Sequence, residues 1–242
     1  MNGFLSRSSV KTHYQPGFTL VEVLVGMVIG LVLIAGLAQL LVGNRQTYRF
    51  KTNLSQLQES GGFALELLAR HLRMAGYRAD WQSPLANPLA GVDGASGASD
   101  QFTVRYQSAT DCLGNNVAGT PPISVNVFSI ANSGGVPNLF CDGDGPQVGT
   151  NAKQPLVAGV EDLQILYGED TDAISDGIAN QYATAGAVNM ARVVSVRVQL
   201  RLRSPDDNLT DTVTAFGDRR IRRVFTSTVT LRNSMVNRAN LP

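Results

Sequence analysis

Oxygen-bearing side chains recur at short intervals between Glu169 and Asn180, where they could bind a metal ion. Calcium takes roughly six to eight oxygen ligands, often from a flexible turn. The candidate ligands here are Asp170, Asp172, Asp176 and Asn180. Against the calcium-loop pattern D-x-[DN]-x-[DN]-G-x5-E, Ile174 occupies an oxygen position and no Glu closes the loop. We therefore expect no cofactor, with calcium kept as an open alternative.

The two cysteines, Cys112 and Cys141, could form a disulfide or contribute to a metal site. A zinc site would need further Cys or His ligands, which the chain does not supply. A disulfide is the default for a domain in an oxidising compartment, and the N-terminal segment described below indicates such a compartment. We predict a Cys112–Cys141 disulfide.

Residues suited to catalysis are scarce. The chain has two histidines, His13 and His71. His13 lies in the expected leader, and His71 is expected on the outer helix. G-x-S-x-G, P-loop and H-E-x-x-H motifs are absent from the sequence. The glycine-containing segment 143–149 follows no long strand that leads into a helix, so it does not fit a nucleotide loop. We expect a protein that is not an enzyme.

Seven arginines gather in two late segments and could form a basic surface for DNA. The net charge is only +1, however, and no aromatic side chains alternate with the arginines as base stacking would require. We therefore favour a solvated sheet face or a subunit contact over nucleic-acid binding. The arginines are Arg197, Arg201, Arg203, Arg219, Arg220, Arg222 and Arg223.

An apolar run over residues 18–42 precedes all of these candidate residues except His13 and determines on which side of a membrane they lie. Only Thr19, Glu22 and Gln39 interrupt it, and a helix of this length spans a hydrocarbon layer of roughly 30 Å. The leader, residues 1–17, carries basic residues and no acid, which predicts a single pass with the leader in the cytoplasm.

The N-terminal side of the apolar run offers a processing site. An ordinary secretory signal is cut behind its apolar run after small residues, but here Gly17 lies directly before the run. We expect any cut to fall between Gly17 and Phe18. Glu22 then has two interpretations: an interfacial anion at a helix start, or a partner for a positive charge inside the apolar layer, such as the new α-amine.

Helical periodicity continues over residues 43–78 as an amphipathic stripe, with Gly61 and Gly62 as a possible bend or melted turn and Gly76 as a stop. Residues 79–242 then read as a β-rich domain. A loop is expected over 81–100, and a disulfide-bearing insertion over about 79–151. Strands are expected at 101–106, 123–130, 156–167 with a bulge at Gly159, 191–203 and 219–232. The expected fold is α+β: a long helix packed on an antiparallel sheet.

The segment Gly17-Phe18-Thr19-Leu20-Val21-Glu22 resembles the type IV prepilin signal. The resemblance implies a pilin-like fold, cleavage after Gly17 by a prepilin peptidase and N-methylation of Phe18. It also implies that Glu22 docks the subunit against the N-terminal amine of a neighbour in a filament.

The stretch from Gln58 to Tyr77, QESGGFALELLARHLRMAGY, resembles the recognition segment of the PilW group of minor pilins. Gly62 and His71 stand where that group has Arg and an acid. Segments 156–168 and 222–233 are also similar to PilW-type chains.

This resemblance implies a minor pilin that primes type IV pilus assembly and can be incorporated at the tip. Its expected partners are the prepilin peptidase, other minor pilins, the major pilin, the inner-membrane assembly platform and a tip adhesin. Its expected location is the bacterial inner membrane with the domain in the periplasm, and later the pilus fibre. The alternatives are a minor pseudopilin of a type II secretion system and a tip adhesin or DNA-binding subunit.

Overall fold

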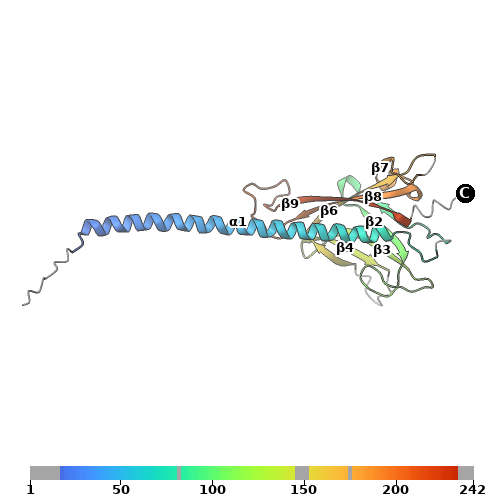
Figure 1. The fold of residues 1–242 in the computed structure, drawn as a ribbon, viewed down its shortest axis with the longest axis horizontal. Helices are drawn as coiled ribbons and strands as arrows, with labels where there is room; N and C mark the ends of the chain where they lie inside the picture. Colours follow the sequence, from blue (N-terminus) through green and yellow to red (C-terminus); the bar gives the residue numbers. More distant parts are fainter. Residues whose placement is uncertain (1–16, 81–82, 145–152, 174–175, 234–242) are drawn as a thin grey trace, which may run out of the picture. The chain divides into compact units, whose positions relative to one another are not determined.

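The computed structural model describes residues 17–80, 83–144, 153–173 and 176–233 (Figure 1). The chain forms two compact units, Met1–Tyr48 and Arg49–Pro242. The border therefore falls a few residues beyond the end of the apolar run, within a helix that belongs to both units.

Helix α1 (Leu20–Met74) is a continuous element of 55 residues. Gly61 and Gly62 are helical, so the expectation of a melted turn there is wrong. In the first unit every residue of the helix is exposed except Gly30, which is partly exposed. By length and composition, this part of α1 could cross a membrane.

In the second unit α1 is amphipathic, as the stripe predicts. Its buried side chains include Leu57, Ala64, Leu68 and Leu72, which join a core with residues of both sheets. The helix ends at Met74, and Gly76 follows with φ +78°, a conformation that favours glycine. The predicted stop is thus confirmed.

The strands form two antiparallel sheets where a single sheet was expected. The first sheet has the order β1-β2-β3-β4-β5 and the second β7-β6-β8-β9. Short 3-10 helices connect some of them: η1 (Ala95–Gly97), η2 (Ala185–Ala187) and η3 (Met190–Arg192). The strands are β1 (Leu89–Val92), β2 (Gln101–Gln107), β3 (Ile123–Ser133), β4 (Val136–Gly143), β5 (Gln154–Ala158), β6 (Val160–Glu169), β7 (Gln181–Ala183), β8 (Val193–Arg203) and β9 (Arg222–Thr230).

The backbone conformation of Gly159 explains why the strands divide into two sheets. The expected strand 156–167 is two strands, β5 and β6, which meet at Gly159 and belong to different sheets. Gly159 has φ +81°, its N–H donates to the Pro137 carbonyl at 2.8 Å, and its carbonyl accepts from the Arg203 N–H at 2.9 Å. A bulge would have kept the strand in one sheet, whereas a left-handed residue turns the chain from one sheet to the next.

Strands β8 and β9 pair antiparallel over nine residue pairs, from Ser195–Thr230 to Arg203–Arg222. In β8 the apolar face is buried at Val196, Val198, Leu200 and Leu202, as the alternation predicts. This strand lies in the middle of its sheet because β6 pairs with its other edge.

We predict opposite effects for two neighbouring glycines in α1. A Cβ at Gly61 would lie 2.5 Å from the Phe225 ring of β9, whereas a Cβ at Gly62 meets nothing within 4 Å. Gly61→Ala should cost roughly 1–3 kcal/mol through overpacking. Gly62→Ala, the matched control, should add up to about 1 kcal/mol through helix propensity. Urea unfolding of the second unit measures both, and equal effects would contradict the packing account.

Candidate functional site

The processing motif lies at the start of α1. Gly17, Phe18 and Thr19 are not helical, and the Phe18 side chain is 84% exposed. The peptide bond expected to be cut thus lies in irregular chain directly before the helix. The basic leader, residues 1–16, lies outside the described residues. Cleavage and methylation remain predictions.

Glu22 lies in the first turn of α1. Its backbone N–H donates to the Thr19 carbonyl at 3.1 Å and lies 3.3 Å from Thr19 Oγ1, so Thr19 caps the helix. The positive end of the helix dipole favours a carboxylate at this position. This geometry suits either interpretation of Glu22, so the docking role remains a prediction.

The disulfide between Cys112 and Cys141 is present, as predicted, with Cα atoms 6.5 Å apart. Cys141 is fully buried in β4, and Cys112 lies in the segment between β2 and β3. The Cys112 N–H also donates to the Asn126 carboxamide oxygen in β3 at 2.6 Å. The segment that carries Cys112 is therefore anchored to two strands of the first sheet.

The acidic segment after β6 brings together three of the four calcium candidates. Carboxylate oxygens of Asp170, Asp172 and Asp176 lie within 4.8 Å of one another, with Asp170 buried and the other two exposed. Asn180 is engaged elsewhere: its carboxamide oxygen accepts from the Thr171 N–H at 2.8 Å, and its Nδ2 donates to Asp172 at 3.0 Å. The fourth candidate is therefore held by protein groups.

A cation already lies beside this acidic segment. Arg192 places its guanidinium 3.9 Å from Asp170 and donates to the Asp172 carbonyl at 2.6 Å. The Asp170 carboxylate also accepts from the Gly177 N–H at 3.0 Å. Arg192 thus offsets part of the negative charge that would attract a metal ion.

We therefore predict that calcium leaves the stability of the domain unchanged. A bound ion at a hundred times its dissociation constant would add about 2.7 kcal/mol to the free energy of unfolding. Thermal unfolding in millimolar calcium, compared with a chelator, measures this, with Asp172→Asn as the control variant. A higher melting temperature that is lost in Asp172→Asn would contradict the prediction.

His71 lies on α1, and its side chain contacts residues of the first sheet. Its Nδ1 lies 2.8 Å from the Tyr106 hydroxyl, and its ring centroid lies 4.9 Å from that of Phe128. Burial, with the nearby Arg70 charge, lowers the His71 pKa to about 4. Burial also raises the Tyr106 pKa to about 12, so Tyr106 stays protonated and can donate to the neutral imidazole.

Much of the arginine stripe is neutralised by carboxylates. Glu161 of β6 lies 2.7 Å from Arg222, 3.7 Å from Arg201 and 3.8 Å from Arg203. Asp162 lies 3.5 Å from Arg201. These pairs weaken the case for a DNA-binding surface, because such a surface needs cations that phosphates can reach.

A third carboxylate, Asp218, joins this network from the segment before β9. It lies 2.6 Å from Arg222 and 3.7 Å from Arg220, and the bonds to Arg222 hold its pKa far below the usual range. The aromatic ring of Phe216 contacts both Arg222 and Arg201, at 4.1 and 5.0 Å from the ring centroid.

The sequence interpretation missed these partners of the arginines. One signal was available: Glu161 and Asp162 precede the apolar alternation of β6, and Asp162 is the cross-strand partner of Arg201. Asp218 and Phe216 come from an irregular segment, where no periodicity indicates a partner.

Two family models match the chain. The prokaryotic N-terminal methylation motif matches residues 12–38, and the model for type IV pilus-assembly protein W, PilW, matches residues 127–233. The first match covers the processing motif and the start of α1. The second runs from β3 to the end of β9 and therefore includes strands of both sheets.

Comparison with solved structures finds a type IV-like pilin from Thermus thermophilus, with a TM-score of 0.43 and 16% sequence identity. The match covers 74% of this chain and 96% of that chain. No curated protein matches the chain significantly.

The two family matches, taken together with the fold, identify the family. The methylation motif lies where an exposed apolar helix begins, and the PilW match covers most of the antiparallel domain on which the second part of that helix packs. The helix anchors the chain in a membrane, and the motif implies contact with the pilus machinery and with other pilins. This chain is accordingly a type IV minor pilin of the PilW family.

Proposed function

We propose that this minor pilin primes type IV pilus assembly together with other minor pilins and stays at the pilus tip. The observation that supports this most directly is the contiguous processing motif on a fully exposed apolar helix, in a chain whose domain matches PilW. Such a helix needs an apolar environment, which a membrane supplies before assembly and a filament core supplies after it.

The proposed sequence of events follows from the residues. A prepilin peptidase cuts after Gly17 and methylates the new N-terminus at Phe18, while the domain lies in the periplasm. Residues 18–42 then move from lipid into the equally apolar core of a filament. The partners in this step are other minor pilins, the major pilin and the inner-membrane assembly platform, and Glu22 selects the register.

Deletion of the gene tests the proposal. Surface pili are counted with the retraction motor present and absent, and secreted enzymes are assayed in the same strains. A priming role predicts that pili disappear while retraction operates and are partly restored without it, because priming sets how often assembly starts. Normal pili with failed secretion would instead assign the protein to a type II secretion system as a minor pseudopilin.

A further inference from the structure

Two tripeptides in the sequence have the form Asn-x-Ser/Thr with a middle residue other than proline. This pattern is the acceptor motif for N-linked glycans, and it is used where the asparagine lies on the surface of an exported domain. One is Asn53-Leu54-Ser55 in α1, and the other is Asn208-Leu209-Thr210 between β8 and β9. The two asparagines have opposite environments in the fold.

Asn53 is closed to modification in the folded domain. It is 3% exposed. Its Nδ2 donates to the Arg49 carbonyl at 2.9 Å and to the Asp206 carboxylate at 3.1 Å, and its Oδ1 accepts from the Asp206 N–H at 3.0 Å. A glycan on this Nδ2 would break these bonds inside a packed region. The role of Asn53 is therefore to hold Asp206, two positions before Asn208.

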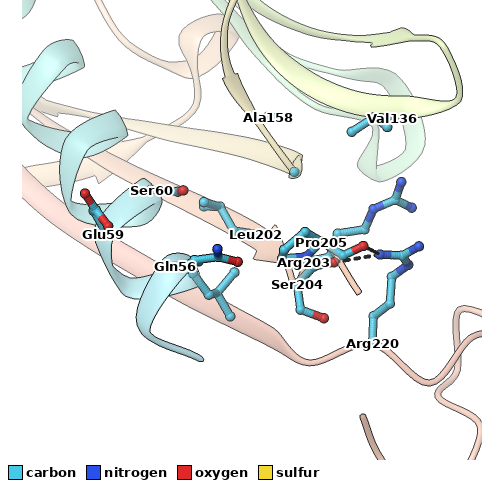
Figure 2. A pocket seen from close by; sticks show the side chains of 12 residues that line it. Gln56, Glu59, Ser60, Val136, Ala158, Leu202, Arg203, Ser204, Pro205 and Arg220 are labelled. Carbon is cyan, nitrogen blue, oxygen red and sulfur yellow. Dashed lines mark hydrogen bonds between the residues drawn. The ribbon is translucent and has the colours of Figure 1, made fainter. Parts of the chain in front are cut away.

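The segment that carries Asn208, residues 204–221, joins β8 to β9 and contains no helix or strand. Its two ends are tied together, because Arg220 donates to the Ser204 carbonyl at 2.8 Å and to the Pro205 carbonyl. Figure 2 shows these bonds at the edge of a pocket that the same residues line. Connections longer than about 12–15 residues without secondary structure are uncommon in compact domains and usually carry a function or lack order.

Asn208 is exposed in this segment. Its φ of +59° is left-handed, a turn conformation that asparagine adopts more readily than most residues. The Asp207 carboxylate accepts from the Asn208 N–H at 2.7 Å, and the Arg219 carbonyl accepts from the Leu209 N–H at 2.9 Å. The backbone of the turn is thus held on both sides. Among the described residues none hydrogen-bonds the Asn208 carboxamide, so its Nδ2 is free to react.

The chain itself keeps this segment close to the membrane. Donors of N-linked glycans are joined to polyprenyl diphosphate, whose lipid tail stays in the bilayer, so an acceptor must lie within reach of the membrane surface. The apolar run ends at residue 42, and Asn53 binds Asp206 of the segment. Even if it were fully extended, the chain from residue 42 to Asn53 would span at most roughly 40 Å.

We propose that Asn208 accepts an N-linked glycan from a polyprenyl-diphosphate-linked oligosaccharide, through a membrane-bound oligosaccharyltransferase. The Asn208 Nδ2 forms a bond to C1 of the first sugar, and the bond between C1 and the diphosphate oxygen breaks. The polyprenyl diphosphate leaves with the electron pair of that bond and takes up the proton that Nδ2 loses. The step is a group transfer that needs neither an oxidant nor a reductant.

Thr210 supplies the hydroxyl of the motif. It is partly exposed, and its Oγ1 donates to the Thr212 carbonyl at 2.8 Å within the same segment. A single neutral hydrogen bond at the surface contributes little net stability, because water or another protein can replace it. The transferase can therefore bind this hydroxyl without unfolding the segment.

This inference goes beyond the proposed priming role and rests only on the proposed periplasmic location of the domain. The test is the intact mass of the tagged full-length chain, purified from the membranes of its native host. The unchanged chain should carry the mass of one glycan. The modified fraction should fall at least tenfold in Asn208→Gln and in Thr210→Ala.

Two matched variants should keep the glycan. Thr210→Ser retains a hydroxyl, so it separates the motif from any effect of changing Thr210 on the fold. Ser55→Ala removes the motif at Asn53 and leaves the Asn53 carboxamide with its hydrogen bonds, and Ser55 is exposed in α1. Leader cleavage and N-methylation change the mass of every variant equally and cancel in the comparison.

An unmodified chain would overturn the proposal. So would a mass increase that persists in Asn208→Gln or is lost in Ser55→Ala, because the acceptor would then be another residue. Alkylation of free thiols in the same sample shows whether the location fails as well. If Cys112 and Cys141 are oxidised, the domain reached the periplasm and only the acceptor role fails, whereas free cysteines would remove the location too. The priming role is decided separately, by pilus counts in the deletion strain.

Discussion

Glu22→Ala should leave the chain in the membrane and remove it from pili. Insertion does not need this carboxylate, since a charge in an apolar helix only adds to the cost of insertion. Docking needs it if Glu22 pairs with the N-terminal amine of a neighbour. A charge pair at about 4 Å is worth roughly 4 kcal/mol at an effective dielectric constant of 20, so incorporation should fall tenfold or more.

Membrane fractions and sheared pili, probed for the same tagged chain, measure the two quantities. Gln39→Ala is the matched control, because Gln39 is the other polar residue well inside the apolar stretch of α1 and carries no charge. Glu22→Gln separates charge from hydrogen bonding and should behave like Glu22→Ala. Normal amounts of the Glu22→Ala chain in pili would remove the docking role.

The second unit should lose stability in mild acid because of His71. Its pKa is about 4 in the folded chain, against 6.5 for an exposed histidine, so folding disfavours the protonated imidazole. The stabilising contribution is complete above pH 6.5 and declines as the pH falls towards 4. The total loss is about 3 kcal/mol, because each tenfold change in proton affinity between the folded and unfolded chain corresponds to about 1.4 kcal/mol.

Urea unfolding at several pH values between 7.5 and 4 measures this effect against His71→Gln. The glutamine keeps an oxygen that can accept from the Tyr106 hydroxyl but does not titrate. Carboxylates with lowered pKa values, such as Asp93 and Asp207, titrate in both proteins and cancel in the difference. Parallel stability curves for the two proteins would show that His71 is not the cause.

The elements with long periodic signals were predictable from the sequence. The helical stripe of α1 and the alternation of β8 are supported by many residues each, and both were placed within a few positions. Strands β1, β4 and β7 were missed for local reasons. Strands β1 and β7 have four and three residues, and β4 contains a proline and four consecutive buried residues, so none of them alternates.

The functional residues were predictable where they belong to a continuous sequence motif, and not where their role depends on the tertiary structure. Gly17, Phe18 and Glu22 belong to the continuous motif 17–22, which can be recognised without knowledge of the tertiary structure. The two cysteines could be paired because few alternatives existed. The contact of His71 with the first sheet could not be predicted. The apolar stripe on this helix is broad, so the sequence does not show which residues at its margins pack against a sheet. The split at Gly159 depended on a backbone angle, which a periodic pattern does not report.

The disulfide limits how far the chain can be stretched. Cys112 and Cys141 are 29 positions apart and enclose all of β3. If a force pulls on the two ends of the domain, the disulfide keeps this loop closed. Roughly 100 Å of chain, at about 3.3–3.6 Å per residue, then cannot be extended. The first sheet therefore keeps a covalently closed segment under tension. A subunit that bears force in a fibre would reach its maximum extension at a shorter length than a subunit without the disulfide.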